Sequence, residues 1–210
     1  MVQINKITLC LRSVNESIYT TTLHTVLNFG MMCKMHNIQL DVHISPSDKS
    51  CIPKLLKTCD RLVWLDYGVA LDATTVAKLS TPFPENVKIM VVPTVIPNVN
   101  WERFKLKTTM GSPEPVNQRA LEFDTAVIES REIVKGVSEF VKSANEGRIV
   151  AFDSKAVLKK ITSSVSLNKL KEEGIKIGVL NGDTALCHFT YECVGNILET
   201  SGVKLRNDIN

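Results

Sequence analysis

Short apolar runs alternate with stretches of helical spacing along the first half of the chain. The apolar runs are rich in β-branched and aromatic residues and are bounded by polar turn residues, which is typical of buried strands. Strict alternation of apolar and polar side chains over 38–44 indicates a strand with one solvated face. The predicted strands of this half are 6–11, 38–44, 62–65 and 87–92.

Helical spacing fills the intervals between these strands. A long helix is predicted from about 17 to 35, a short one through 55–56, and a third begins at Asp72, whose side chain suits the N-cap position. One face of the long helix carries Leu23, Val26, Leu27 and Met31. The β-α-β-α-β-α-β order predicts an α/β fold with a mostly parallel central sheet flanked by helices.

The second half of the chain is less regular. The segment 93–119 contains four prolines and is predicted to be a long excursion with little regular structure. Such a loop serves as a lid or binding segment, or it is an ordinary surface insertion. A helical stretch is predicted to begin at 123–128. The remaining predicted elements are a strand at 148–152, two short helices within 154–173, a strand at 175–180 and a helix at 189–201.

Composition narrows the class of protein. The 210 residues are 44% apolar and 22% charged, as in ordinary globular proteins, and a net charge of +3 does not indicate a nucleic-acid partner. No window reaches the about 18 uninterrupted apolar residues of a membrane span, and no signal-peptide pattern opens the chain. The six cysteines form no C-x-x-C pair and are interpreted as reduced thiols. We therefore expect one domain over 1–210, alone or as the N-terminal part of a larger protein, in the cytoplasm.

The strand at 62–65 is followed by the sequence Asp66-Tyr67-Gly68 and then by the helix capped by Asp72. In open α/β sheets, ligands bind beyond the carboxyl ends of the strands. A carboxylate that leaves such a strand is placed to meet a ligand or a metal ion. The alternative is that Asp66 only begins a turn, because Asp and Gly are ordinary turn residues.

Common nucleotide and catalytic fingerprints are absent. The chain has no G-x-x-x-x-G-K-[ST], no G-x-G-x-x-G after its first strand, no H-E-x-x-H and no G-x-S-x-G. The opening at 7–16, an apolar strand with a turn that ends in Asn-Glu before a long helix, resembles the opening of GT-A fold glycosyltransferases. The block 62–79 is similar to that family's metal-binding strand end, although the D-x-D motif reads Asp66-Tyr67-Gly68 and lacks its second carboxylate.

Two later segments narrow the resemblance. The segments 114–125 and 187–192 resemble blocks in glycosyltransferases of large algal (chlorella) viruses that act in capsid-protein glycosylation. The resemblance implies a GT-A, Rossmann-like fold with a mixed, mostly parallel sheet, and a location in the host cytoplasm if the protein is viral. It also implies a UDP-sugar donor and a glycan or glycoprotein acceptor, without nucleic acid or a membrane span.

The resemblance further implies a Mn²⁺ or Mg²⁺ ion that holds the donor diphosphate. Its ligands would be Asp66 and, by position, His188, and an imidazole ligand favours manganese. Because the second Asp is missing, the ion could instead be held through water or with help from Asp72, or Lys105 and Arg119 could contact the phosphates. The residues assigned to the nucleotide-sugar are Leu11, Arg12, Ser13, Asp41, Asp66, Tyr67, Gly68 and Arg119.

A carboxylate near the anomeric carbon must deprotonate the acceptor hydroxyl or stabilise an oxocarbenium-like transition state. Glu122, Asp124 and Asp183 are the candidates. Asp124 has an alternative role as the cap of a following helix, and Asp183 as a turn residue. Sequence supplies no carboxylate separation, so retention and inversion both stay open.

The prediction is therefore a glycosyltransferase that moves a sugar from a UDP-sugar to a glycan or glycoprotein, assisted by a metal ion. The second hypothesis is a nucleotidyltransferase, but the turn after the first strand lacks the Gly-rich loop that is typical of nucleotidyltransferases. The third reading is a non-catalytic nucleotide-sugar-binding or scaffold module of the same fold. The missing carboxylate at Gly68 is the feature that keeps this third reading open.

Overall fold

The computed structural model describes most of the chain and divides it into two compact units. Described are residues 3–46, 49–84, 86–96, 99–114, 116, 119–143, 147–162, 165–180 and 186–187, with backbone alone for 126–130, 143, 186 and 187. The first unit comprises Met1–Thr94 and Asp124–Leu186, and the second comprises Val95–Phe123 and Cys187–Asn210.

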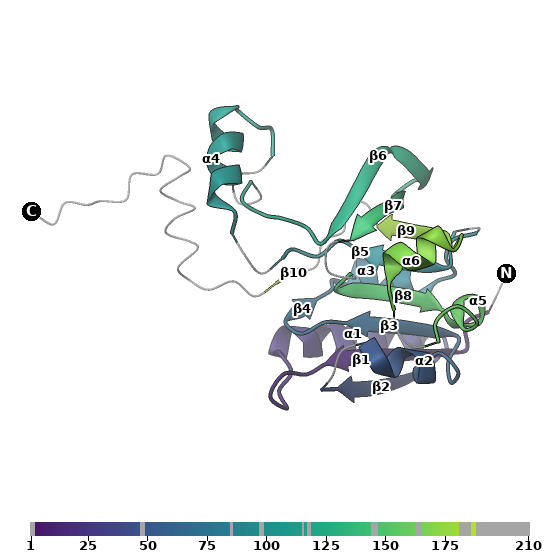
Figure 1. Cartoon of the computed structure of the whole chain (residues 1–210). Coiled ribbons are helices and arrows are strands. Elements are labelled where there is room, and N and C mark those ends of the chain that lie inside the picture. The colour runs from purple at the N-terminus through teal and green to yellow at the C-terminus, as the bar shows by residue number, and fades with distance from the viewer. Residues whose placement is uncertain are drawn as a thin grey trace, which may run out of the picture. The chain divides into compact units, whose positions relative to one another are not determined.

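The first unit is built on a mixed sheet. Its strands are β1 (Lys6–Arg12), β2 (Gln39–Ser45), β3 (Arg61–Leu65), β5 (Ile89–Val92), β6 (Thr125–Val134), β7 (Val137–Ser143), β8 (Ile149–Asp153) and β9 (Ile177–Leu180). They form one eight-stranded sheet in the order β2-β1-β3-β8-β5-β9-β7-β6 (Figure 1). Two further short strands, β4 (Val69–Ala70) and β10 (Leu186–Cys187), form a separate two-stranded sheet.

Parallel pairing is confined to part of this sheet. Strand β1 pairs in parallel with β2 and β3, and β5 pairs in parallel with β9. Strand β8 runs antiparallel between β3 and β5, and β7 runs antiparallel to both β9 and β6. The predicted mixed α/β class is confirmed. The sheet is not mostly parallel, however, since four of these seven pairings are antiparallel. Each antiparallel pairing involves β7 or β8 from the second half of the chain, whose directions could not be predicted from the sequence.

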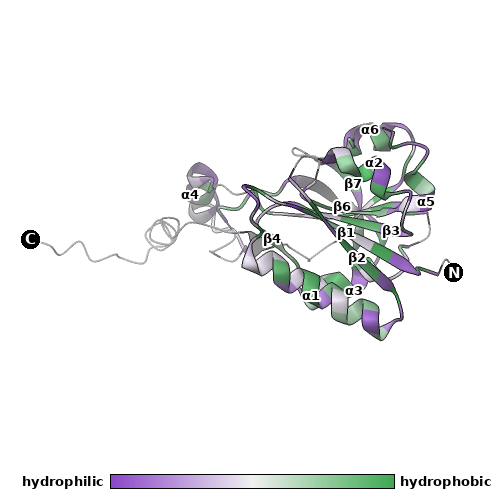
Figure 2. Ribbon diagram, turned by 90° about the horizontal axis from the view of Figure 1, so that it is seen from below, coloured by the Kyte–Doolittle hydropathy of each residue, from purple (hydrophilic) through white to green (hydrophobic). Residues whose placement is uncertain are grey.

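Helices cover both faces of the sheet. One face carries α1 (Thr20–Met35) and α3 (Ala73–Ser80), and the other carries α2 (Ile52–Leu55), α5 (Ser154–Val157) and α6 (Leu167–Glu172) (Figure 2). Under the second group, Trp64, Phe140 and Phe152 pack in one apolar cluster with Ile52 and Leu56. Across the described part of the chain, none of the helices is long and apolar enough to cross a bilayer.

Two local predictions about helices have different outcomes. Asp72 is confirmed as the N-cap of α3, because its carboxylate accepts a hydrogen bond of 2.6 Å from the backbone N–H of Thr75. The apolar face of α1, in contrast, does not pack on the sheet: the side chains of Leu27 and Met31 are 63% and 66% exposed. The helix docks through a different face, which contains Thr22, Thr25, Phe29 and Cys33.

Threonine hydroxyls explain this choice of face. The hydroxyl of Thr22 donates to the carbonyl of Val69, and that of Thr25 accepts from the N–H of Leu71, both at 2.8 Å. These bonds satisfy backbone groups in and just after β4 that would otherwise be buried without a partner. Because the buried face contains polar side chains and the exposed face apolar ones, hydrophobic periodicity alone selects the wrong face.

The predicted helix at 123–128 is wrong, since this segment enters the strand β6. Val134 pairs with Val137 across the two-residue turn Lys135-Gly136, so β6 and β7 form a hairpin. Gly136 has a φ of +83°, a left-handed conformation that glycine adopts without steric cost. The turn signal between two runs of β-branched residues was therefore more informative than the helix-compatible Ala and Glu residues of the first run.

The second unit contains regular structure that the sequence did not predict. Helix α4 (Trp101–Thr109) lies inside the expected irregular excursion, and its N-cap is Asn100, whose side chain accepts from the N–H of Arg103 at 2.8 Å. Phe104 is fully buried within this segment. The helix predicted over 189–201 lies outside the described residues.

The close packing of β9 between β5 and β7 can be tested at Gly178. A Cβ added there would lie 2.8 Å from a methyl carbon of Val137 and 3.2 Å from one of Val87. We expect Gly178→Ala to lower the free energy of unfolding by about 2 kcal/mol, measured by urea denaturation. Gly30→Ala in the middle of α1, where nothing lies within 4 Å, should instead be neutral or stabilising. A neutral Gly178→Ala would contradict this strand order.

Asp60 gives a pH-dependent test of the same unit. Its carboxylate accepts from the backbone N–H groups of Asn5 and Lys6 at 3.0 and 3.2 Å and pairs with Lys155 at 2.9 Å. The Lys155 ammonium, followed by these N–H groups, lowers the pKa of Asp60. A carboxyl whose pKa is lowered by folding stabilises the folded state above its unfolded pKa, and this contribution is lost as the pH falls through the folded value.

Asp60→Asn is therefore expected to be less stable than the wild type at pH 7. The difference in unfolding free energy should shrink as the pH falls below about 4, where the wild-type carboxyl also becomes neutral. Urea denaturation of both proteins over a pH series measures this difference. A gap that stays constant down to the lowest pH would show that the charge of Asp60 has no part in stability.

Candidate functional site

The sheet has a topological switch point between β1 and β3. The chain passes from β1 through α1 to β2 on one side of β1, and then returns across it through α2 to β3 on the other side. Both strands run in the same direction, with Leu11 paired with Leu65 near their carboxyl ends. In open α/β sheets this point is where ligands bind, because the connections diverge there and leave room between them.

A carboxylate and two guanidinium groups meet at this switch point. Asp66, directly after β3, accepts from Nη1 of Arg12 at 3.0 Å and from Nε of Arg148 at 3.1 Å. Its Oδ1 also accepts from the N–H of Tyr67 at 2.8 Å. The side chain of Arg12 is 44% exposed, whereas that of Arg148 is 11% exposed and also donates to the carbonyl of Tyr67. Arg12 therefore faces solvent, and Arg148 mainly fixes the position of Asp66.

Asp124 supports this cluster. It is 1% exposed, and its Oδ2 accepts from the backbone N–H of Arg148 at 2.8 Å. Its Oδ1 accepts from the N–H of Thr94 and the hydroxyl of Thr125, both at 3.0 Å. The expectation that Asp124 caps a helix is wrong because the strand β6 follows it. Asp124 instead fixes the backbone of the arginine that holds Asp66, and its catalytic role stays a prediction.

The turn after β1 packs against the Asp66-Tyr67-Gly68 segment. Val14 and Ser17 pair through two backbone hydrogen bonds across Asn15 and Glu16, which have φ values of +50° and +58°. Asn tolerates this left-handed conformation, whereas it is unfavourable for Glu, so the turn holds local strain. The hydroxyl of Tyr67 lies 3.2 Å from that of Ser17.

Aromatic contacts also join this turn to the strand end. The rings of Tyr19 and Tyr67 form an edge-to-face pair with centroids 5.0 Å apart. Gly68 has a φ of +73°, and a Cβ there would lie 3.7 Å from the ring of Tyr19. Gly68, at the position where a D-x-D motif would have its second carboxylate, thus has a conformational role in this turn.

Of the other residues assigned to the nucleotide, Asp41 lies away from Asp66, and Leu11 and Ser13 are buried. Asp41 pairs in register with Thr8, four positions before the end of β1, and its carboxylate pairs with Lys6 at 2.6 Å. This hydrogen bond with Lys6 lowers the pKa of Asp41. Leu11 is 1% exposed and belongs to the core, and Ser13 is buried with its N–H bonded to the carbonyl of Ser45.

The candidates of the second unit form their own contacts. Glu122 accepts from the side-chain amide of Asn100 at 2.7 Å. The guanidinium of Arg119 donates to the carbonyls of Glu114 and Ser112 at 3.0 and 2.9 Å, which ties its segment together. Their assignments to catalysis and to phosphate binding stay predictions. Asp183 and His188 lie outside the described residues.

The surroundings of Asp66 fit an anion better than a divalent cation. One carboxylate oxygen faces Arg12 and the other faces Arg148, so a cation would have to displace or oppose two guanidinium groups. Within the described ranges, Asp66 belongs to no group of three His, Cys, Asp or Glu side chains close enough to share an ion. One carboxylate against two guanidinium groups leaves a net positive charge, which suits a phosphate.

A hollow at the other end of the sheet does not coincide with this cluster. It has a volume of about 530 Å³ and is lined by Arg61, Phe83, Lys88 and Asp153, among others. Arg61 is the first residue of β3, so this hollow lies at the amino end of the parallel strands. The guanidinium of Arg61 is buried, stacks on Phe83 at 3.5 Å and donates to the carbonyls of Leu79 and Thr81. These contacts make Arg61 a structural residue.

Comparisons with known proteins identify no family for this chain. No protein-family model and no curated protein matches the chain. A solved structure titled A197 from STIV is 13% identical, with 89% of this chain and 86% of that chain covered and a TM-score of 0.45. A putative glucose-1-phosphate thymidylyltransferase from Bacillus anthracis is 11% identical, with 98% and 96% covered and a TM-score of 0.46.

A third similar structure is the 4-diphosphocytidyl-2C-methyl-D-erythritol synthase from Anaerococcus prevotii. It is 10% identical to this chain, with 93% of this chain and 96% of that chain covered and a TM-score of 0.43. At these identities and TM-scores the likeness transfers no substrate and no reaction to this chain.

Arg148 was not among the predicted site residues, because its position beside Asp66 depends on the direction of β8. The residue precedes β8, and β8 runs antiparallel to β3, with Ile149 paired with Leu65. When two strands pair antiparallel, the amino end of one lies beside the carboxyl end of the other. An arginine at the start of the predicted strand 148–152 was visible in the sequence, but the orientation of that strand was not.

The supporting role of Asp124 can be tested by stability. Asp124→Ala should lower the free energy of unfolding by about 3 kcal/mol or more, because it leaves the N–H groups of Thr94 and Arg148 buried without their acceptor. Urea denaturation measures the loss. Asp72→Ala, which removes an exposed helix cap, should cost only about 1 kcal/mol. Equal losses in the two variants would contradict this role.

Proposed function

We propose that this protein is a nucleotide-sugar-dependent glycosyltransferase whose donor diphosphate binds at the carboxyl ends of β1 and β3. The single observation that carries the proposal is the Arg12–Asp66–Arg148 cluster at the topological switch point of the sheet. The resemblance of the first strand, its Asn-Glu turn and the 62–79 block to GT-A enzymes points to the same edge of the sheet. A UDP-sugar is the proposed donor, and a glycan or glycoprotein is the proposed acceptor.

Arg12 is the proposed phosphate contact. A guanidinium has five N–H donors, and the bond to Asp66 engages the Nη1 group of Arg12 on one side. Asp66 holds this side chain in place while its exposed part stays open to a ligand. As the sugar leaves, negative charge grows on the diphosphate, and a fixed guanidinium stabilises that charge without first having to reorient.

A divalent ion is the second way in which the diphosphate could be held. Manganese at Asp66 and His188 would supply a Lewis acid at the leaving group. The two arginine contacts of Asp66 favour direct guanidinium binding over this arrangement. The proposal therefore assigns the diphosphate to Arg12 and treats metal dependence as a question for the binding experiment.

The non-catalytic alternative predicts the same binding without turnover. A module that has kept the fold would bind the nucleotide-sugar at Arg12, and its Asp66 would serve only to orient arginines. The proposed catalytic carboxylates are Glu122, Asp124 and Asp183. Release of UDP from a UDP-sugar, with water or a glycan as acceptor, separates the transferase from the binding module.

The decisive experiment is calorimetric titration with UDP and a panel of UDP-sugars, with and without Mn²⁺. Arg12→Ala is expected to weaken binding about 10- to 100-fold, because it removes a charge-assisted hydrogen bond worth about 1.5–3 kcal/mol. Arg12→Lys keeps the charge but not the planar fork and should recover only part of the loss. Arg131→Ala, which removes an equal charge from an exposed side chain on β6 at the other edge of the sheet, is the matched control and should bind as the wild type.

The dependence on metal decides how the diphosphate is held. Binding that needs no Mn²⁺ and falls in Arg12→Ala would support the guanidinium site. Binding that requires Mn²⁺ and disappears in Asp66→Ala would assign the diphosphate to a metal ion instead. A folded wild type that binds no nucleotide under either condition would rule out the proposed function.

A further inference from the structure

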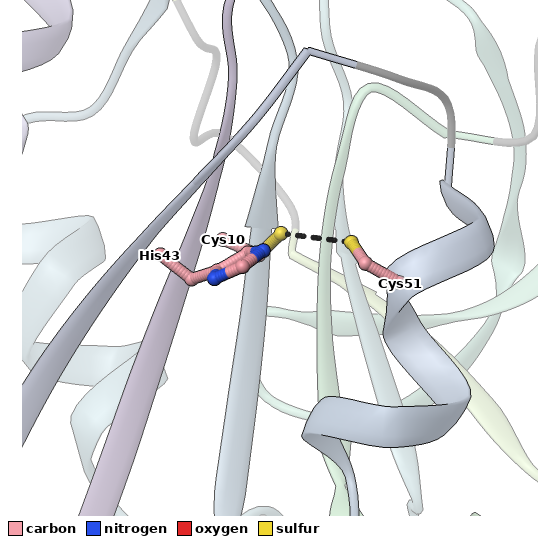
Figure 3. A group of neighbouring side chains, drawn as sticks. All are labelled: Cys10, His43 and Cys51. Atoms are coloured by element: carbon pink, nitrogen blue, oxygen red, sulfur yellow. Dashed lines mark hydrogen bonds between the residues drawn. The ribbon is translucent and has the colours of Figure 1, made fainter.

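Three potential metal ligands converge on the opposite side of β1 from α1. Cys10 lies on β1, His43 on β2, and Cys51 at the end of the short 3₁₀ helix η1 (Lys49–Cys51), which leads into α2. One ligand atom from each lies within 4.8 Å of the other two, and the two sulfurs are 3.4 Å apart (Figure 3). Cys10 is distant in sequence from the other two residues, so no local motif joins the three.

Strand register brings the first two ligands together. Cys10 and His43 are direct partners in the parallel pairing of β1 with β2, so their side chains project from the same face of the sheet. The chain then turns back at the end of β2, and η1 carries Cys51 over this face. In Figure 3 the three side chains point toward a common centre from two strands and one helix.

The donor set suits a thiophilic ion. Thiolate and imidazole are the ligands that select zinc, whereas Mg²⁺ and Ca²⁺ prefer oxygen. Around a tetrahedral zinc ion, with Zn–S of about 2.3 Å and Zn–N of about 2.0 Å, two sulfurs lie about 3.8 Å apart and sulfur and nitrogen about 3.5 Å. The observed sulfur separation of 3.4 Å is within a few tenths of an ångström of this value. It is much longer than the about 2.05 Å of a disulfide.

We propose that Cys10, His43 and Cys51 bind one Zn²⁺ ion as a Cys₂His site with an open fourth position. Cys10 is fully buried and Cys51 partly so, which excludes bulk water from the sulfur side. His43 is exposed, so the ion can enter from its side and can keep a water molecule or take another ligand there. Three protein ligands with one open position is the arrangement of reactive rather than purely structural zinc sites.

The ion would also cross-link the fold. It would join β1, the edge strand β2 and the segment that leads into α2, which otherwise meet through the hydrogen bonds of one strand pair and side-chain packing. Binding to the folded state alone should therefore raise thermal stability. The site is independent of the proposed nucleotide site, because none of its three ligands takes part in the cluster at Asp66.

The test uses the full chain, reduced and freed of metal. Titration with Co²⁺ should produce the near-ultraviolet thiolate-to-cobalt absorption and the visible bands of a tetrahedral ion, and one equivalent of Zn²⁺ should abolish them. One Zn²⁺ per chain by calorimetry, with a rise in melting temperature of about 5 to 10 °C at 100-fold excess over the dissociation constant, is expected.

Variants identify the ligands without disturbing the buried position of Cys10. Cys51→Ser and His43→Ala should each weaken Zn²⁺ binding by more than about 100-fold, beyond the loss expected for an outer-shell residue. Cys59→Ser is the matched control: it removes another partly buried thiol, whose Sγ donates to the carbonyl of Leu55 at 3.4 Å, and should bind Zn²⁺ as the wild type.

Three results would overturn the proposal. A folded, reduced wild type that gives no thiolate-to-cobalt absorption has no such site. Absorption that persists in both Cys51→Ser and His43→Ala comes from other cysteines. A Cys10–Cys51 disulfide in the oxidised protein, together with no metal uptake by the reduced one, would make the two thiols a redox pair instead. None of these results depends on whether the protein binds UDP.

Discussion

The antiparallel position of β8 between β3 and β5 determines which residues lie beside the carboxyl ends of the parallel strands β1 and β3. Had this position been filled by a parallel strand, its amino end would lie at the opposite edge. Because β8 runs the other way, Arg148 arrives beside Asp66 just as β8 begins. Its side chain bonds one aspartate and its backbone N–H bonds another, Asp124. Two carboxylates from distant parts of the chain are thus fixed by a single arginine.

This arrangement changes the chemical meaning of Asp66. A solitary carboxylate after a buried strand is an obvious candidate for a metal ligand, and the sequence supports that interpretation. With a guanidinium against each oxygen, the same carboxylate becomes the counter-charge that keeps two arginines in place. Either arrangement places positive charge where a diphosphate would lie. The difference is whether that charge is built into the chain or supplied by an ion.

Local patterns predicted the elements of the first half of the chain, and long-range pairing decided the rest. The buried strand 61–65 and the Asp72 cap could be recognised because apolar runs and capping side chains act over a few residues. The hairpin of β6 and β7 was not predicted, because Ala, Glu and Arg in its first strand are also compatible with a helix and only the Lys135-Gly136 turn favours a hairpin. The docking face of α1 depends on hydroxyl bonds to β4, which periodicity does not register.

The candidate sites follow the same division. Asp66 was a candidate because it directly follows a predicted strand, and Arg12 was assigned through the resemblance to GT-A enzymes. Arg148 required the direction of β8, and the convergence of Cys10 with His43 required the register of β1 against β2. One residue of slip in that register would place the two side chains on opposite faces. Composition and motif spacing contain no information about register. The positions of the cysteines in the sequence therefore do not show which of them lie close together in the fold.

The chain leaves the first unit after Thr94 and re-enters it at Asp124, and these two residues are bonded to each other. The N–H of Thr94 donates to the carboxylate of Asp124, and the N–H of Asp124 donates to the carbonyl of Thr94. The ends of the 95–123 segment are therefore clamped at one point of the scaffold. These two hydrogen bonds hold the ends of the segment together whatever residues lie between them. Over evolution, the length and sequence of this segment can therefore diverge while the strands on either side keep their places.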